Sequence, residues 1–404
     1  MINYFAWDKR STPVNSAAAR ILLCLWTLWI LVMFEWGGYP LWPSPLYDLL
    51  PVFRHPAIFP HIEWIAAVCG LLVLSVLIGY RIRFTAWGAA VLLTYLGTVR
   101  EAYQISHSSG LLMTAALLFV LIAVFNREDK INVDQIRRTR GRELISLTSH
   151  LETDTGQHRH RALKWGLVVI GFFYFHTGFK KLISSPIEWV QPASLGRFIL
   201  FGMDGDGTRF LGEFMLEYPV LLLIGAIMTI LLEFGFLLAI VLKKKVWLFF
   251  FGIIGMHISI MFSVGPVFID QLILLGIFIP WDIILEKVQP TEKLVIVYDK
   301  HCFFCARSLH LFKFLDVVDS VTYYNQNTVP DKYNNEKTDF RNAMYAFRGG
   351  SSYRGYYAFK CLFQQVGFYP LSGIMSLPGV KHVGERVYQH IADNRSRYFV
   401  CSVQ

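Results

Sequence analysis

The sequence predicts a polytopic α-helical membrane protein that carries a small C-terminal α/β domain. Of the 404 residues, 54% are hydrophobic and only 17% are charged, whereas a soluble domain has roughly 25% charged residues. Long apolar runs fill residues 1–285 and stop there. Residues 290–404 have a mixed composition, and a short β-branched run there precedes two closely spaced cysteines. The expected domains are therefore residues 1–288 and 289–404.

The membrane part contains about eight apolar segments. A helix needs about 20 apolar residues to cross the hydrocarbon core of a bilayer, and the third and the last segments are the weakest by length. The first segment is expected to remain as a span, because no small-residue cleavage site follows it. The segments comprise residues 17–36, 62–80, 84–99, 109–125, 162–183, 218–242, 247–264 and 267–284.

The basic residues of the connecting segments indicate the orientation. The net charge is +9, and in an apolar chain an excess of Lys and Arg marks the cytoplasmic loops rather than a nucleic-acid partner. If the spans alternate, the basic residues of four separate segments fall on one side, and the connection after the fifth span, on the other side, is acidic. Both termini and the C-terminal domain are therefore predicted to be cytoplasmic. The basic residues are Lys9, Arg10, Arg20, Arg81, Arg83, Arg127, Lys130, Arg137, Arg138, Arg140, Arg142, Arg159, Arg161, Lys243, Lys244 and Lys245.

Several ionisable side chains fall inside or at the ends of the apolar segments. A charge at the centre of a membrane helix costs about 2.5–3.5 kcal/mol, so each one needs a reason. Each has a structural alternative: a lysine pair can extend to the interface, a glutamate can pair with a buried cation, and a lone histidine can be a hydrogen-bonded core residue. Together they predict a polar cavity near the outer leaflet, in which a desolvated lysine can act as a general base. These residues are His107, His176, Lys180, Lys181, Glu233, His257 and Asp270.

Residues 10–285 resemble the transmembrane unit of vitamin K-dependent gamma-carboxylase, known as the horizontally transferred transmembrane (HTTM) domain. The central match is His176-Thr-Gly-Phe-Lys-Lys-Leu182, followed by Glu188-Trp-Val. Further similar pieces occur in the same order along the chain. They are Arg127–Asp134, His107-Ser108, Leu232-Glu233, Met256-His257 and Met261–Gly265.

This resemblance implies a quinone-linked enzyme with Lys181 as the base that deprotonates a vitamin K-like hydroquinone. Lys180 and Glu233 belong to the implied catalytic set. His107, His176 and His257 are implied to hold the quinone oxygens or relay protons, and the implied second substrate is a peptide or protein glutamate. Two matched positions differ from the family, with Ser106 before His107 and Glu233 in place of Asp. No large extracytoplasmic domain is expected in residues 286–404, and bacterial relatives of the unit need not carboxylate. A bacterial inner membrane is the expected location.

The C-terminal domain begins with a strand, a Cys-x-x-Cys motif and a helix. Leu294–Tyr298 is the β-branched run, Cys302 and Cys305 follow Asp299, and residues 306–315 have helical spacing. This order is typical of a thioredoxin-like domain. A helix N-terminus stabilises a thiolate, so the first cysteine is predicted to attack a disulfide and the second to resolve the mixed disulfide.

A zinc site is the alternative interpretation of these cysteines. A structural zinc ion needs four ligands, and Cys361 and Cys401 are available to complete a set, although they lack the paired spacing. No metal is therefore predicted.

Residues 292–402 are similar to the DCC family of thiol–disulfide oxidoreductases, named for its Asp-Cys-Cys pattern. The pattern Tyr-Asp-x-x-Cys-x-x-Cys carries the similarity, with Ser352–Ala358 and Val387–Arg395 as later matches. Lys300 stands where the family usually has Gly. The resemblance implies a redox-active dithiol, with Asp299 shaping the loop or moving protons.

The two halves are predicted to act separately. In the predicted topology Lys181 is extracytoplasmic and Cys302 is cytoplasmic, with roughly 30 Å of hydrocarbon between them. The expected partners are the lipid bilayer, a quinone and a peptide or protein substrate. The alternative is a non-enzymatic accessory or assembly subunit of a larger membrane complex, in which the Cys-x-x-Cys motif is a redox sensor or a structural element.

Overall fold

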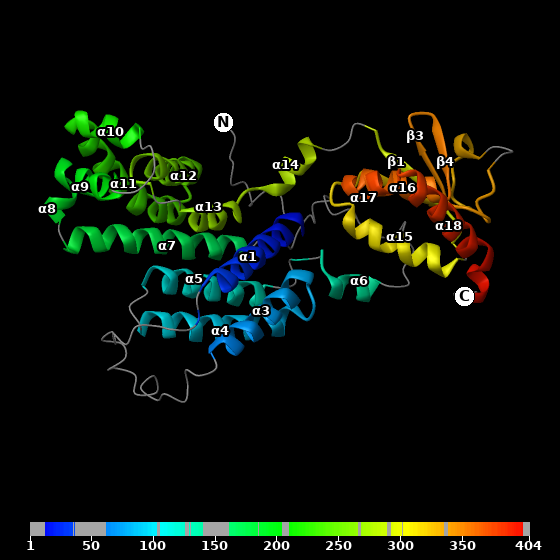
Figure 1. Cartoon of the computed structure of the whole chain (residues 1–404), viewed down its shortest axis with the longest axis horizontal. Coiled ribbons are helices and arrows are strands. Elements are labelled where there is room, and N and C mark those ends of the chain that lie inside the picture. Colours follow the sequence, from blue (N-terminus) through cyan, green and yellow to red (C-terminus); the bar gives the residue numbers. More distant parts are fainter. Residues whose placement is uncertain are drawn as a thin grey trace. The chain divides into compact units, whose positions relative to one another are not determined.

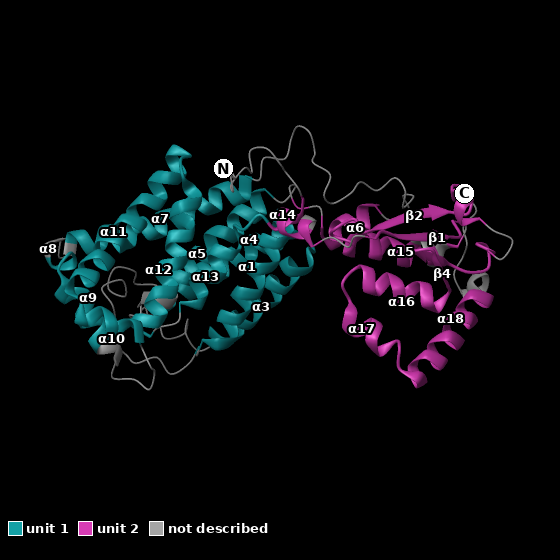
Figure 2. Ribbon diagram, turned by 90° about the horizontal axis from the view of Figure 1, so that it is seen from above, with its two compact units in different colours: residues 1–11, 15–128, 156–280 teal, residues 12–14, 129–155, 281–404 magenta. Residues whose placement is uncertain are grey.

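The structure is a computed structural model of the chain, and its described residues form two compact units (Figure 2). Unit 1 takes in residues 1–11, 15–128 and 156–280, and unit 2 takes in residues 12–14, 129–155 and 281–404. The described residues are 13–34, 36, 62–102, 106–125, 129, 131–139, 161–184, 186–203, 210–265, 268–288, 292–300, 302–334 and 338–398.

Unit 1 is a bundle of apolar helices (Figure 1). Five of the described helices, α1, α4, α7, α11 and α12, are long and apolar enough to cross a membrane, and α3 and α5 are shorter apolar helices. Seven of the eight predicted segments coincide with these single helices. Their bounds are α1 Pro13–Met33, α3 Ile62–Ile78, α4 Ile82–Ala102, α5 Ser106–Val124, α7 Arg161–Ser184, α11 Pro219–Leu242 and α12 Val246–Ser263.

The helices of unit 1 are apolar on their outer faces as well as in the core. Trp26, Phe119 and Phe236 are almost fully buried, whereas Leu71 is 64% exposed and Val220 is 65% exposed. A helix that packs one face on a core in water carries polar residues on the other face. Apolar side chains on both faces suggest a membrane protein.

The eighth predicted span, residues 267–284, does not form a single helix, so the prediction of one continuous span was wrong. The segment forms α13 (Ile269–Gly276) and α14 (Trp281–Lys287), which are separated by a turn. Pro280 lies directly before α14, and a proline has no N–H to donate and disfavours helical backbone at the residue before it. The break therefore follows from Pro280.

The acidic connection after α7 contains three helices that the sequence did not predict. They are α8 (Pro186–Trp189), α9 (Pro192–Met203) and α10 (Phe210–Glu217). Gly212 allows α10 to lie close to the end of α12, since a Cβ atom at this position would be 2.3 Å from the carbonyl oxygen of Ser263.

Unit 2 is built on a four-stranded mixed sheet with the strand order β2-β1-β3-β4. β1 pairs in parallel with β2 and antiparallel with β3, and β3 pairs antiparallel with β4. The helix α15 connects β1 to β2, so these three elements form a βαβ unit. The bounds are β1 Leu294–Tyr298, α15 Phe303–Leu315, β2 Val321–Asn325, β3 Tyr345–Arg348, β4 Ser351–Arg354, α16 Tyr356–Gln365, α17 Tyr369–Ile374 and α18 Pro378–Tyr398, with a short 3-10 helix at Asp331–Tyr333.

The central strand β1 is buried on both faces, as its continuous β-branched sequence predicts. Ile296 packs with Leu309 of α15 and Leu362 of α16, while Val295 and Val297 pack in a second cluster on the other face. The helix that carries the cysteines is therefore attached to a rigid strand.

A further helix, α6 (Val133–Thr139), belongs to unit 2 although it lies within residues 1–288 of the sequence. The hydroxyl of Thr139 donates to the carbonyl oxygen of Gln135 at 2.8 Å, which leaves its oxygen to accept from Nε2 of His310 at 3.0 Å. His310 lies on α15 and is 7% exposed, and its ring packs edge-on against Phe314. This contact explains why α6 packs with the C-terminal domain.

His310 is expected to make unit 2 less stable in mild acid. Burial lowers the pKa of His310 below the ordinary 6.5, so the folded chain favours the neutral ring. As the pH falls through about 6.5, the unfolded chain takes up the proton first, and the stabilisation that is complete above this pH is lost. We expect the melting temperature of the solubilised chain to fall more between about pH 7.5 and pH 5.5 than that of His310→Gln.

The matched control for this measurement is His382→Gln, because His382 is exposed on α18. It should follow the pH dependence of the wild type. Equal pH dependence in wild type and His310→Gln, measured by differential scanning fluorimetry, contradicts the prediction.

Candidate functional site

The first candidate site is the Cys-x-x-Cys motif at the N-terminus of α15. Cys302 is the N-cap residue of this helix, and its Sγ accepts a hydrogen bond from the backbone N–H of Cys305 at 3.4 Å. The first N–H groups of a helix have no partner within the helix, and the positive end of the helix dipole lies there. The predicted position of Cys302 at a helix N-terminus is therefore present, and this position favours negative charge on its sulfur; the thiolate itself stays a prediction.

Two backbone N–H groups hold the loop that leads into the motif. The N–H of Cys302 donates to the carbonyl oxygen of Asp299 at 3.2 Å, and the N–H of Lys300 donates to Oε1 of Gln326 at 2.7 Å. Asp299 is half-buried at the end of β1, and His301 lies outside the described residues. Asp299 thus shapes the loop through its main chain, and its role in moving protons stays a prediction.

The two thiols differ in access. Cys302 is 1% exposed, and Cys305 is half-buried. The cysteine with the stabilised sulfur is therefore not the more accessible of the two, a difference that sequence spacing alone could not show.

Cys361 serves the core of the domain. It lies on α16 in the cluster that contains Ile296 and Leu309, and burial raises the pKa of its thiol. Cys401 lies outside the described residues. Within the described ranges, no three His, Cys, Asp or Glu side chains are grouped so that they could hold a metal ion.

The second candidate site is a polar cluster inside unit 1. Nζ of Lys181 on α7 lies 2.5 Å from Oε1 of Glu233 on α11, and Glu233 is 3% exposed. Nζ of Lys181 also lies 5.2 Å from the centre of the Trp189 ring. Gly178 makes this approach of α7 and α11 possible, because a Cβ atom there would be 3.0 Å from Cβ of Glu233.

A hydrogen-bonded pair lies in the same part of the bundle. The hydroxyl of Tyr174 on α7 lies 2.8 Å from Nε2 of His257 on α12, and His257 is 6% exposed. Tyr174 and Lys181 lie on the same helix, α7. Oε2 of Glu233 and Nδ1 of His257 have no hydrogen-bond partner among the described residues. The cluster can therefore hold a proton and still offers free hydrogen-bonding positions.

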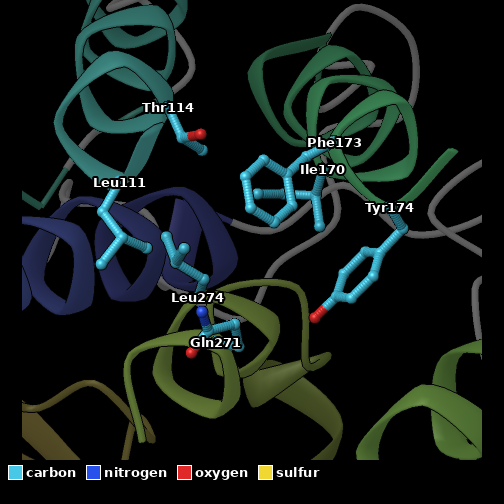
Figure 3. A pocket seen from close by; sticks show the side chains of 7 residues that line it. All are labelled: Leu111, Thr114, Ile170, Phe173, Tyr174, Gln271 and Leu274. Carbon is cyan, nitrogen blue, oxygen red and sulfur yellow. The ribbon is translucent and has the colours of Figure 1, made fainter. Parts of the chain in front are cut away.

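A small cavity lies next to this cluster (Figure 3). Three residues with polar side chains line it: Tyr174 of α7, Gln271 of α13 and Thr114 of α5. Gln271 is 5% exposed, and its Oε1 has no hydrogen-bond partner in the described structure. The remaining lining residues are apolar: Leu111, Ile170, Phe173 and Leu274.

The structure separates the predicted residues of unit 1 into two groups. Lys181, Glu233 and His257 come together, whereas His176 and Lys180 are exposed on the outer face of α7. Lys180 thus fits the alternative of a lysine that extends from the bundle. The side chain of His107 lies outside the described residues. Asp270 has a structural role, because its Oδ1 accepts from Nε1 of Trp26 at 2.8 Å.

Sequence reasoning missed Tyr174 and Gln271. Tyr174 lies seven residues before Lys181 and therefore on the same helix face. This spacing could have identified it from the sequence. Gln271 has no such signal, because only the packing of α13 brings it to the cavity.

Residues 296–401 match the family described as DCC1-like thiol-disulfide oxidoreductase. Neither a curated protein nor a solved structure matches the chain. The resemblance of residues 10–285 to the gamma-carboxylase unit stays a prediction. The match covers the last three residues of β1, both cysteines and α15 to α18, so residues 296–401 form a DCC1-like thiol–disulfide oxidoreductase domain.

Proposed function

We propose that the chain is a membrane-bound thiol–disulfide oxidoreductase that uses Cys302 and Cys305. The observation that carries this proposal is the position of Cys302 as N-cap of α15 inside a βαβ unit, with its sulfur on the amide of Cys305. A Cys-x-x-Cys motif beside a βαβ unit is the thioredoxin-like redox arrangement. The apolar helices of unit 1 support a membrane location, and the basic connecting segments support a cytoplasmic thiol domain.

The exchange reaction needs two steps. The thiolate of Cys302 attacks one sulfur of a substrate disulfide, which forms a mixed disulfide and releases the other substrate sulfur as a thiolate that takes up a proton. The thiolate of Cys305 then attacks Sγ of Cys302, which forms the Cys302–Cys305 disulfide and releases the second substrate thiol. The substrate gains two electrons and the domain loses two, so a thiol reductant must regenerate the dithiol.

Thiol trapping of the full chain tests this proposal. The purified chain is equilibrated with reduced and oxidised glutathione at several ratios, and the free thiols are then alkylated and counted by mass spectrometry. Cys302 and Cys305 should lose their free thiols together and reversibly, and Cys361→Ser should show the same transition. If the two cysteines form no disulfide at any ratio, or hold a co-purified zinc ion instead, the proposal is wrong.

For unit 1 we propose proton-transfer chemistry on a quinone, supported by the Lys181–Glu233 pair in an apolar bundle. Transfer of a proton from Lys181 to Glu233 leaves a neutral amine, which can then accept the proton of a hydroquinone hydroxyl. In this proposal the Tyr174–His257 pair, which is hydrogen-bonded across α7 and α12, holds a quinone oxygen. Carboxylation of a peptide glutamate rests on the resemblance alone.

Quinone extraction tests this second proposal. The purified chain is extracted with organic solvent, and bound quinone is measured for wild type, Lys181→Ala and Lys180→Ala. Wild type and Lys180→Ala should retain quinone, and Lys181→Ala should lose it. If wild type holds none under conditions that retain its lipids, unit 1 is better interpreted as an accessory subunit of a larger membrane complex.

A further inference from the structure

The thiol domain has one concentrated apolar surface on α17 and α18. Among the side chains that the structure describes in residues 292–394, the exposed large hydrophobic ones other than Leu311 lie between residues 368 and 387. We call residues 368–387 the α17–α18 surface. Its most exposed members include Tyr369 (66%) and Val383 (62%). Concentrated exposed apolar side chains indicate an interaction site.

The core of the domain already uses a different face of α18. Gly384 lies against Tyr356, where a Cβ atom would be 2.2 Å from the ring, and the backbone N–H of Met344 donates to the hydroxyl of Tyr388 at 3.1 Å. Val380, Val383 and Val387 follow at helical spacing and are exposed. The exposed stripe is therefore additional to the face that attaches α18.

Basic residues accompany the stripe. The basic residues Lys381 and Arg386 lie within the α17–α18 surface, and Glu385 is its one acidic residue. Arg386 is exposed beside Val387, and Lys381 lies over the Tyr357 ring at 5.5 Å. Glu385 accepts a hydrogen bond from the hydroxyl of Tyr357. An apolar stripe with basic neighbours is typical of helices that lie in the interface of an anionic membrane.

Three chain connections link the domain to the apolar helices, and one of them, residues 140–160, joins α6 to α7. Residues 125–132 join α5 to α6, which contacts α15 through Thr139 and His310. Residues 264–293 join α12 to β1 and contain α13 and α14. The connection from α5 to α6 reaches at most about 30 Å when fully extended. If α5 spans a bilayer, as in the proposed function, the short connection keeps the thiol domain close to the surface of that bilayer.

We propose that the α17–α18 surface binds the surface of an anionic lipid bilayer. In this contact Val380, Val383 and Val387 lie in the membrane interface, and the basic residues contact the anionic headgroups. This proposal rests on the membrane location in the proposed function. The contact holds the thiol domain at the membrane and directs it toward substrates at that surface.

Hydrogen exchange of the full chain in nanodiscs tests the proposal. The discs contain phosphatidylcholine alone or with phosphatidylglycerol, and a detergent sample is run beside them. The amides of residues 368–390 should exchange about tenfold more slowly in the anionic discs, as expected for a helix that gains a stabilising partner. The amides of α16 should not change.

Variants and controls distinguish lipid binding from contact of this surface with detergent or with another copy of the chain. Val383→Asn with Val387→Asn should remove the slowing, and Leu311→Asn, which removes an exposed apolar side chain outside the surface, should keep it. Equal exchange in all samples, equal protection in detergent, or protection that depends on the number of copies per disc would overturn the proposal. A chain that does not enter nanodiscs contradicts the membrane location itself, and the two failures are thus distinguishable.

Discussion

Replacing Lys181 with alanine is expected to destabilise the helical unit by about 3–5 kcal/mol, the usual cost of removing one partner of a buried ion pair. Glu233 is 3% exposed, and its Oε1 lies 2.5 Å from the lysine nitrogen. Without Lys181 the carboxylate stays in apolar surroundings with no cation to compensate it. Thermal unfolding of the solubilised chain, followed by tryptophan fluorescence, measures the loss.

Two further variants show whether the pair is the cause. Replacing both partners, as Lys181→Met with Glu233→Leu, should recover most of the stability, since apolar residues of similar size replace a buried pair at little cost. Lys180→Ala should change the free energy of unfolding by no more than about 0.5 kcal/mol, because Lys180 is exposed. A double variant that is less stable than Lys181→Ala contradicts this explanation.

The second prediction concerns the roles of the two cysteines. Cys305→Ser should accumulate a stable mixed disulfide between Cys302 and an added disulfide peptide, because no second thiol remains to resolve it. Cys302→Ser should form no adduct, and the turnover of both variants should fall to the background rate. Intact-protein mass spectrometry before and after reduction identifies the adduct.

Cys361→Ser is the matched control, because Cys361 is a buried cysteine of the same domain outside the motif. It should turn over at the rate of the wild type and form no lasting adduct. An adduct on Cys302→Ser in place of Cys305→Ser shows that the roles are exchanged. Exchanged roles are the alternative, because Cys305 is half-buried and thus more accessible than Cys302, which is 1% exposed.

Much of the helical unit could be predicted from the sequence, because an apolar run of about 20 residues forms a helix from local interactions alone. The break within residues 267–284 could also have been predicted, since Pro280 interrupts this apolar run. The helices α9 and α10 were missed because their apolar segments are short and lie among acidic residues, where hydropathy carries little signal.

The candidate site in unit 1 could be predicted only as a set of residue types. Lys181, Glu233 and His257 stood out because charged and polar groups are costly inside apolar helices. The distinction between Lys181 and its neighbour Lys180 depends on the rotation of α7 against α11, and the close approach at Gly178 sets that contact.

For the thiol domain, the strand, the two cysteines and the helix that follows them could be predicted from local pattern, because these elements are adjacent in the chain and obey local rules of strand and helix formation. Three features came from the three-dimensional packing instead: β1 pairs with both β2 and β3, α6 joins this domain through Thr139 and His310, and Cys302 is the more buried thiol. These features depend on contacts between residues far apart in sequence, and local pattern carries no information about such contacts.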